Sequence, residues 1–138
     1  MRFGTPVAVL AVLLSLGGAP AFAAVCFDKS MSLEEIVGAI DATPGCEAAM
    51  KLFTDCEFGT SGDIRLGAAV EKKCEGDFLG RLRPPQKQAY RREIAVCDDK
   101  YRNESGTMYR SFTAICRAEV SQRYSQRALK AAGSSKPR

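Results

Sequence analysis

The chain has 138 residues, a formal net charge of +4, six cysteines and no histidine. Without histidine, Ser–His and Cys–His catalytic pairs and zinc sites of mixed cysteine and histidine ligands are excluded. The acidic pairs Glu34–Glu35 and Asp98–Asp99 are only adjacent in sequence, so their side chains diverge on a helix surface and do not converge as in a glycosidase. We therefore expect neither an enzyme nor a cofactor or metal site.

Residues 1–23 have the order of a secretory signal peptide. Arg2 precedes a mostly apolar run from Val7 to Leu16, and Ala21 and Ala23 supply the small residues that signal peptidase needs. This run is well short of the roughly 20 residues that a membrane-spanning helix requires. We expect cleavage after Ala23 or one residue later, at Ala24, and export to the periplasm or the medium without a transmembrane anchor.

The chain after this segment divides into an acidic half and a basic half. Residues 24–77 hold 5 basic and 11 acidic side chains, whereas residues 78–138 hold 14 basic and 5 acidic ones. The basic half could attract phosphates, an anionic membrane surface or the acidic groups of a cell wall. Solvated helix faces, with complementary packing between the halves, would give the same pattern. Nucleic-acid binding would need stacking aromatic residues on a basic groove, and the exported location argues against it.

Helix signals dominate residues 24–132, and strand-like alternation is scarce. A first helix begins at Ser32, which forms a Ser-x-x-Glu capping box with Glu35, and ends before Thr43. A second helix has Thr43 as its cap and Pro44 in its first turn, and Gly59 ends it. Its expected inward-facing residues are Cys46, Ala49, Met50, Phe53 and Cys56.

A third helix has Ser61 as its cap and Asp63 in its first turn, and it runs until Pro84–Pro85. Its expected inward-facing residues are Leu66, Val70, Cys74 and Phe78.

A fourth helix begins at about Pro85 and breaks at residues 103–106, and a fifth runs from about Thr107 to Ala132. The expected inward-facing residues are Tyr90, Ile94, Cys97 and Tyr101 on the fourth helix and Tyr109, Phe112, Cys116, Val120 and Arg123 on the fifth. Residues 133–138 are expected to form a disordered tail. The prediction is a single all-α domain over residues 24–132, a small disulfide-stapled bundle of about five helices arranged as hairpins.

An even number of cysteines after a signal peptide predicts structural disulfides. The sequence has no Cys-x-x-Cys pair, so the local signature of a thioredoxin-type dithiol or a zinc knuckle is absent. Cys46 and Cys56 cannot bond each other, because ten residues of helix separate them by about 15 Å and a disulfide needs Cα atoms within roughly 7 Å.

Hairpin symmetry selects the pairs, since residues equidistant from a turn face each other in antiparallel helices. Two cysteines lie fourteen residues on either side of Thr60, and two others are centred near Gly106. The remaining pair joins the N-terminal segment to the end of the second helix. The expected disulfides are Cys26–Cys56, Cys46–Cys74 and Cys97–Cys116.

The second half of the chain carries a family resemblance. The residues concerned are Leu82 to Arg92 (Leu-Arg-Pro-Pro-Gln-Lys-Gln-Ala-Tyr-Arg-Arg), Cys97, Gly106 to Tyr109 (Gly-Thr-Met-Tyr), Cys116 to Glu119 (Cys-Arg-Ala-Glu) and a basic run to Leu129. With the region of Cys46 and Cys56, the chain resembles the LprI-type lysozyme-inhibitor family of small exported helical proteins over roughly residues 44–130. The resemblance implies structural cysteines and binding to lysozyme, and it assigns no inhibitory residue.

Two functions are open at this point. The first is an exported non-catalytic binding protein that inhibits lysozyme-like muramidases, whose often basic surfaces suit the acidic half. The alternative is an envelope structural or interaction protein whose basic C-terminal helices bind anionic wall polymer or the membrane surface. The expected basic surface consists of Arg110, Arg117, Arg123, Arg127 and Lys130.

Overall fold

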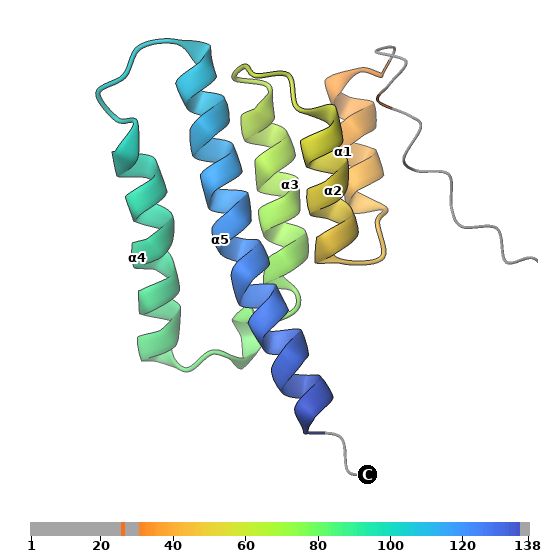
Figure 1. Ribbon diagram of the computed structural model, residues 1–138, viewed down its shortest axis with the longest axis vertical. Coiled ribbons are helices and arrows are strands. Elements are labelled where there is room, and N and C mark those ends of the chain that lie inside the picture. The colour runs from red at the N-terminus through yellow and green to blue at the C-terminus, as the bar shows by residue number, and fades with distance from the viewer. Residues whose placement is uncertain (1–25, 27–30, 136–138) are drawn as a thin grey trace, which may run out of the picture.

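The computed structural model describes Cys26 and residues 31–135, and the predicted signal peptide lies outside the described residues. The helices are α1 (Leu33–Asp41), α2 (Cys46–Cys56), α3 (Asp63–Glu75), the short 3-10 helix η2 (Leu79–Arg81), α4 (Pro84–Lys100) and α5 (Thr107–Ser134). They run alternately up and down, and α5 lies between α4 and α3 (Figure 1). The described part of the chain contains no strand, so the predicted all-α, disulfide-stapled bundle is confirmed.

The start of α1 is as predicted, but that of α2 is not. Ser32 and Glu35 form the expected capping box. The N-cap of α2 is Gly45, not Thr43. The buried Thr43 hydroxyl instead donates a hydrogen bond to the carbonyl oxygen of Ile40 at 2.8 Å. Thr43 therefore closes the end of α1, and its side chain is not available to begin the next helix.

The turn before α3 is organised by a buried carboxylate. Asp63 is fully buried and accepts hydrogen bonds from the backbone N–H groups of Phe58 and Gly59, both at 2.8 Å. Its Oδ2 also accepts the hydroxyl of Ser111 on α5 at 2.7 Å. The N-cap of α3 is Gly62, so the prediction that Ser61 caps this helix is wrong. Asp63 therefore fixes the turn before α3 and ties the start of this helix to α5.

The third helix is shorter than predicted, since α3 ends at Glu75 and does not reach the two prolines. Asp77 and Phe78 follow its end, and both make tertiary contacts from the turn that replaces the expected last turns of the helix. The Asp77 carboxylate accepts the Ser125 hydroxyl at 2.5 Å. The buried Phe78 ring lies 5.1 Å from the Tyr90 ring and 5.3 Å from the Tyr124 ring, centroid to centroid.

The buried face of α5 differs from the predicted one. Val120 is buried as expected, but Phe112 is 39% exposed and Arg123 is exposed. Small residues at spacings of three and four form most of the buried face instead: Ser111, Ala114, Ala118, Ser121 and Ser125. We call these five residues the α5 seam. Serine and alanine carry no strong hydrophobic signal, so the periodicity of large apolar residues predicts a different buried face for this helix.

The seam allows α5 to approach α3 closely. Gly67 of α3 is buried, and a Cβ atom placed on it would lie 3.0 Å from both the Cβ and the carbonyl oxygen of Ala114. The main core contains side chains from α1, α2 and α3 together with Ala114 and Ala118. Helix α5 therefore completes the core of the N-terminal helices.

The C-terminal end of α5 extends past the predicted boundary. Gly133 and Ser134 are helical, so the prediction of a tail from residue 133 is wrong for these two residues. The Ser134 hydroxyl donates to the Lys130 carbonyl at 3.0 Å, and that of Ser135 donates to the Ala131 carbonyl at 2.9 Å. Both are bonds from a serine hydroxyl to the carbonyl four residues earlier, which serine commonly forms on a helix. Residues 136–138 lie outside the described part.

The cysteines form the same three pairs that hairpin symmetry predicts. The Cα–Cα distances are 5.3 Å for Cys26–Cys56, 4.5 Å for Cys46–Cys74 and 5.7 Å for Cys97–Cys116. The first two bonds lie within the segment that ends with α3, and the third joins α4 to α5. None of the three connects these two parts, so noncovalent packing holds them together.

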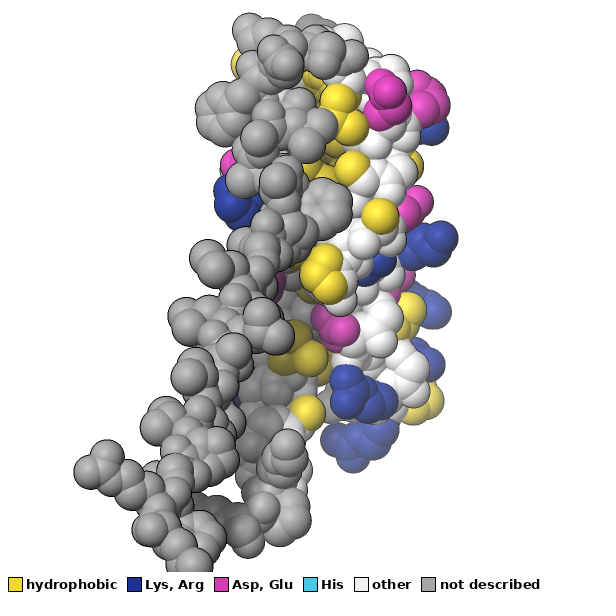
Figure 2. All heavy atoms as spheres, turned by 90° about the vertical axis from the view of Figure 1, so that its right-hand side faces the viewer, with side chains coloured by type: hydrophobic (Ala, Val, Ile, Leu, Met, Phe, Trp, Pro, Cys, Tyr) yellow, Lys and Arg dark blue, Asp and Glu magenta, His cyan; other side chains and the backbone are white. Residues whose placement is uncertain are grey.

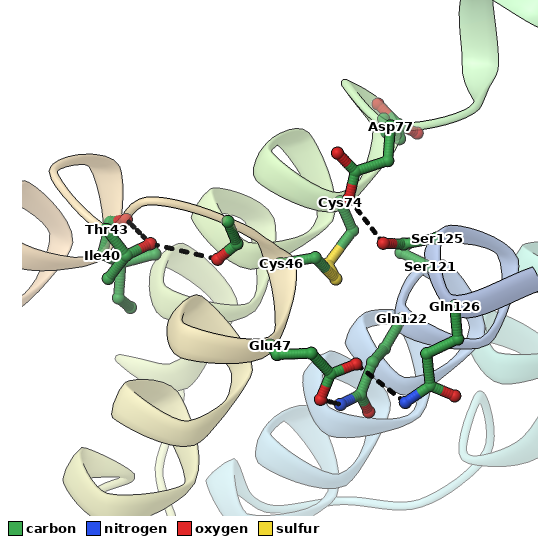
Figure 3. Close-up of a disulfide and its surroundings, with 12 residues drawn as sticks. Ile40, Thr43, Cys46, Glu47, Cys74, Asp77, Ser121, Gln122, Ser125 and Gln126 are labelled. Carbon is green, nitrogen blue, oxygen red and sulfur yellow. Dashed lines mark hydrogen bonds between the residues drawn. A yellow bond between two sulfur atoms is a disulfide. The ribbon is translucent and has the colours of Figure 1, made fainter. Parts of the chain in front are cut away.

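Polar contacts also join α2 to α5 beside one of these disulfides. In Figure 3, the bond between Cys46 and Cys74 lies next to α5. The Glu47 carboxylate accepts hydrogen bonds from the side-chain amides of Gln122 and Gln126 at 2.9 and 2.8 Å.

Among the helices of residues 31–135, none has the length and apolar character needed to cross a membrane.

We expect Gly67→Ala to lower the free energy of unfolding by about 1–3 kcal/mol, because the backbone of Ala114 cannot rotate away from the added methyl group. The matched control is Gly38→Ala in α1, where no atom lies within 4 Å of the added methyl. This control should raise stability by roughly 0.5–1 kcal/mol through helix propensity. Urea unfolding without reductant measures both changes. Equal effects of the two substitutions would contradict close packing at Gly67.

Candidate functional site

An open groove of about 540 Å³ lies over the upper half of α5, between α3 and α4. Its walls include Ile64 and Glu71 of α3, Asp98 of α4 and Tyr101 directly after α4, and its floor includes Arg117 of α5. Pockets of this volume hold small molecules in many proteins. The charged groups of this groove can bind a ligand only if they are not already paired with one another.

Arg117 is the central charge of this groove, and it is fully engaged. Its guanidinium donates two hydrogen bonds to the Glu71 carboxylate, both at 3.0 Å, and two to the Asp98 carboxylate, both at 2.8 Å. Partial burial alone would lower the pKa of Arg117, but the two carboxylates outweigh it and raise the pKa above its ordinary value. Arg117 therefore stays charged and links three helices.

A buried tyrosine continues this network beneath the groove. The Tyr90 hydroxyl donates to the Glu75 carboxylate at 2.9 Å and lies 2.8 Å from the Ser121 hydroxyl. Burial, together with the neighbouring Glu75 carboxylate, raises the pKa of Tyr90. The phenol is thus held neutral, and it connects α4 to the end of α3 and to the α5 seam. Glu71, Asp98 and Arg117 bind one another in the groove, which indicates a structural role for these three residues.

A second charged region has no such compensation. Because α4 and α5 are antiparallel, the first turns of α4 lie near Tyr124 and Ala128, and α5 continues beyond them to its C-terminal end (Figure 1). Residues 79–92 and 123–130 contain eight basic side chains and no acidic one. We call these eight residues the basic end: Arg81, Arg83, Lys87, Arg91, Arg92, Arg123, Arg127 and Lys130. All are exposed except Lys87, which is half-buried.

Few of the guanidinium groups in the basic end meet an acidic side chain. Arg123 lies 3.6 Å from the Glu93 carboxylate, measured between nitrogen and oxygen. The Arg127 guanidinium lies 5.2 Å from the centre of the Tyr124 ring, which holds it by a cation–π contact. The local excess of positive charge therefore faces solvent, where it can act on an anionic partner.

The structure divides the basic surface that was expected from the sequence. Arg123, Arg127 and Lys130 belong to the basic end, whereas Arg110 and Arg117 line the groove nearer the start of α5. Arg117 is closed off by its carboxylate partners.

Sequence reasoning missed the contribution of α4 and the segment before it. Hairpin symmetry could have revealed this contribution. The symmetry about Gly106 that pairs Cys97 with Cys116 also places Lys87 of the fourth helix opposite Ser125 of the fifth.

The opposite charge gathers on the first two helices. Residues 33–57 contain six acidic residues and one basic residue. The acidic residues are Glu34, Glu35, Asp41, Glu47, Asp55 and Glu57, and we call them the acidic face. On the face drawn in Figure 2, Asp and Glu side chains gather toward the upper end, and Lys and Arg side chains gather toward the lower end.

Hydrogen bonds keep part of the acidic face ionised. The pKa of Glu34 is lowered by its bond to Arg65, and the pKa of Glu35 is lowered by its bonds to Ser32. Both carboxylates therefore carry their charge well below neutral pH. A basic partner would meet a negatively charged surface here.

No metal site is evident among residues 31–135 and Cys26, where no three cysteine, aspartate or glutamate side chains come together as metal ligands. All six cysteines are in disulfides.

No family model, curated protein or solved structure matches this chain. The resemblance to the LprI-type family stays a prediction. The surfaces themselves carry the functional argument.

Stability should fall as the pH rises above about 10, the ordinary tyrosine pKa. The unfolded chain then loses the Tyr90 proton while the folded protein keeps it, so unfolding is favoured. We expect Tyr90→Phe to flatten this decline and to lower stability at neutral pH by about 1–3 kcal/mol, because Glu75 and Ser121 lose a partner. Urea unfolding of both proteins between neutral pH and pH 11 tests this. Parallel pH profiles would contradict it.

Proposed function

We propose that this chain is an exported, non-catalytic binding protein that attaches to an anionic component of the cell envelope through the basic end. The observation that carries the proposal is the gathering of eight cationic side chains from α4, α5 and the segment before α4, with no acidic residue in those ranges. An anionic polymer or membrane surface presents many charges at once, which is the partner such a cluster suits. Three disulfides are consistent with an oxidising compartment outside the cytoplasm.

The attraction should be sensitive to salt, since exposed charges are screened over about 8 Å at physiological ionic strength. It also needs no catalytic group, in keeping with a sequence that has no histidine. The network around Arg117 supports this function indirectly, because it fixes α4 and α5 in the arrangement that brings the basic end together.

The test uses the triple variant Arg83→Gln, Arg127→Gln and Lys130→Gln. We expect about a 100-fold loss of affinity for vesicles that contain anionic phospholipid, because each cation near such a surface contributes about 1 kcal/mol. Co-sedimentation at low and high salt measures the binding, and isolated peptidoglycan is assayed in parallel.

The matched control is Lys100→Gln, Arg102→Gln and Arg110→Gln, which removes the same charge at the other end of α4 and the start of α5. It should lose much less affinity. If the wild-type protein binds neither vesicles nor peptidoglycan at low salt, the proposed function is wrong. Equal losses in the two variants would show that net charge acts without a localised site.

The acidic face supports a second candidate, the inhibition of a lysozyme-like muramidase. Six acidic residues against one basic residue over residues 33–57 suit a strongly basic protein surface. This candidate also agrees with the resemblance to the LprI-type family. This candidate relies on the acidic face, whereas the first relies on the basic end, so substitutions in each surface test the two functions separately.

We expect the purified protein, at a stoichiometric amount and low ionic strength, to slow muramidase turnover on cell-wall substrate. Asp41→Asn combined with Glu57→Gln should weaken the effect several-fold, because two exposed charges of the acidic face are lost. The triple variant of the basic end serves as the control and should inhibit normally. Unchanged turnover with the wild-type protein would rule out this candidate.

A further inference from the structure

The basic end contains an apolar depression of about 390 Å³, which opens between the segment after α3, α4 and α5. Phe78 and Leu82 contribute to it from the segment after α3, Ala89 from α4, and Tyr124 and Ala128 from α5. We call it the apolar pocket. Its volume falls within the range of sites for small organic ligands. Gln86, Tyr124 and Arg127 are the lining residues with polar groups, and the Tyr124 hydroxyl already donates to the Glu93 carboxylate at 2.7 Å.

Part of the lining of this pocket meets solvent. The lining residue Leu82 is half-buried, and Leu129, which is on α5 outside the lining, is 50% exposed. Most of the other large exposed apolar side chains lie toward the opposite end of the bundle, on or beside the turns before α3 and α5. Exposed apolar surface beside a pocket marks a place where an apolar partner is buried.

A cation stands at the same pocket. Arg127 lines it directly, and its guanidinium is held 5.2 Å from the centre of the Tyr124 ring. A guanidinium group binds phosphate oxygens through paired hydrogen bonds. The site thus combines an apolar cavity with one phosphate-binding group, the Arg127 guanidinium, in its lining.

We propose that the apolar pocket takes an acyl chain of an anionic phospholipid at a membrane surface, while Arg127 binds its phosphate. This inference rests on the proposed function and names the membrane as the anionic partner. A wall polymer would be attracted by the same charges, but its sugars and peptides have no long apolar chain to fill the pocket.

The first test compares wild-type affinities for soluble short-chain phosphatidylglycerols of increasing chain length, below their micelle concentrations, and for glycerol phosphate. Titration in about 0.5 M salt suppresses the purely electrostatic contribution. We expect affinity to rise by up to about fourfold for each methylene that is buried, and glycerol phosphate to bind weakly. Affinity that does not depend on chain length would overturn the acyl pocket.

The second test fills the pocket with Ala89→Trp. The matched control is Ala95→Trp, which places the same side chain at an exposed position of α4 outside the pocket lining. Far-ultraviolet circular dichroism and urea unfolding first establish that both variants fold. We expect Ala89→Trp to lose about tenfold in affinity for phosphatidylglycerol vesicles at high salt, and the control to bind as the wild type does.

The outcomes separate this inference from the proposed function. If Ala89→Trp binds vesicles as tightly as the wild type and affinity does not depend on chain length, the acyl pocket is wrong while attachment through the basic end stands. If the wild-type protein binds peptidoglycan but not anionic vesicles, the basic end has a wall polymer as its partner and the lipid inference is overturned. If it binds neither, both proposals fail.

Discussion

The architecture depends on the close contact between α3 and α5. No disulfide links the N-terminal three helices to the α4–α5 hairpin, so this contact must hold them together. Gly67 allows it by leaving room for the backbone of Ala114. The buried serines of the α5 seam have hydrogen-bond partners, with Ser111 bonded to Asp63 and Ser125 to Asp77. Small side chains therefore bring the helices together, and satisfied hydroxyl groups avoid the cost of burying polar atoms.

The same contact determines which charges remain available. Arg117 joins Glu71 and Asp98, so one cation of the basic half is neutralised between the helices. The basic end is too far along α4 and α5 to share these carboxylates, and it meets solvent with a large positive excess. The acidic face lies on α1 and α2, across α3 from α4 (Figure 1), and its member Glu47 contacts Gln122 and Gln126 of α5. Separation of the charges along the chain thus largely persists in the folded protein.

Much of the local structure followed from short-range chemistry. Ser32 and Glu35 form a capping box because four consecutive residues suffice to define it. The start of α2 was mispredicted because the Thr43 hydroxyl had two possible backbone partners, and the end of α1 provided the buried one. Hydrophobic periodicity did not predict the α5 seam, because serine and alanine are buried through their contacts with other helices and not through their own hydrophobicity. Their burial depends on Gly67 and Asp63, more than forty residues earlier in the chain.

The sequence by itself determined the all-α class, the order of the helices and the cysteine pairs, because helix periodicity and hairpin symmetry act between neighbouring segments. Only the tertiary structure decided which basic residues form one surface. Arg117 is not part of that surface, because it binds Glu71, which lies 46 residues earlier in the chain. The basic residues of α4 joined Arg127 and Lys130 because antiparallel packing brings the start of one helix to the end of the next. The apolar pocket among them has the same origin, since its walls come from three segments that meet only after folding.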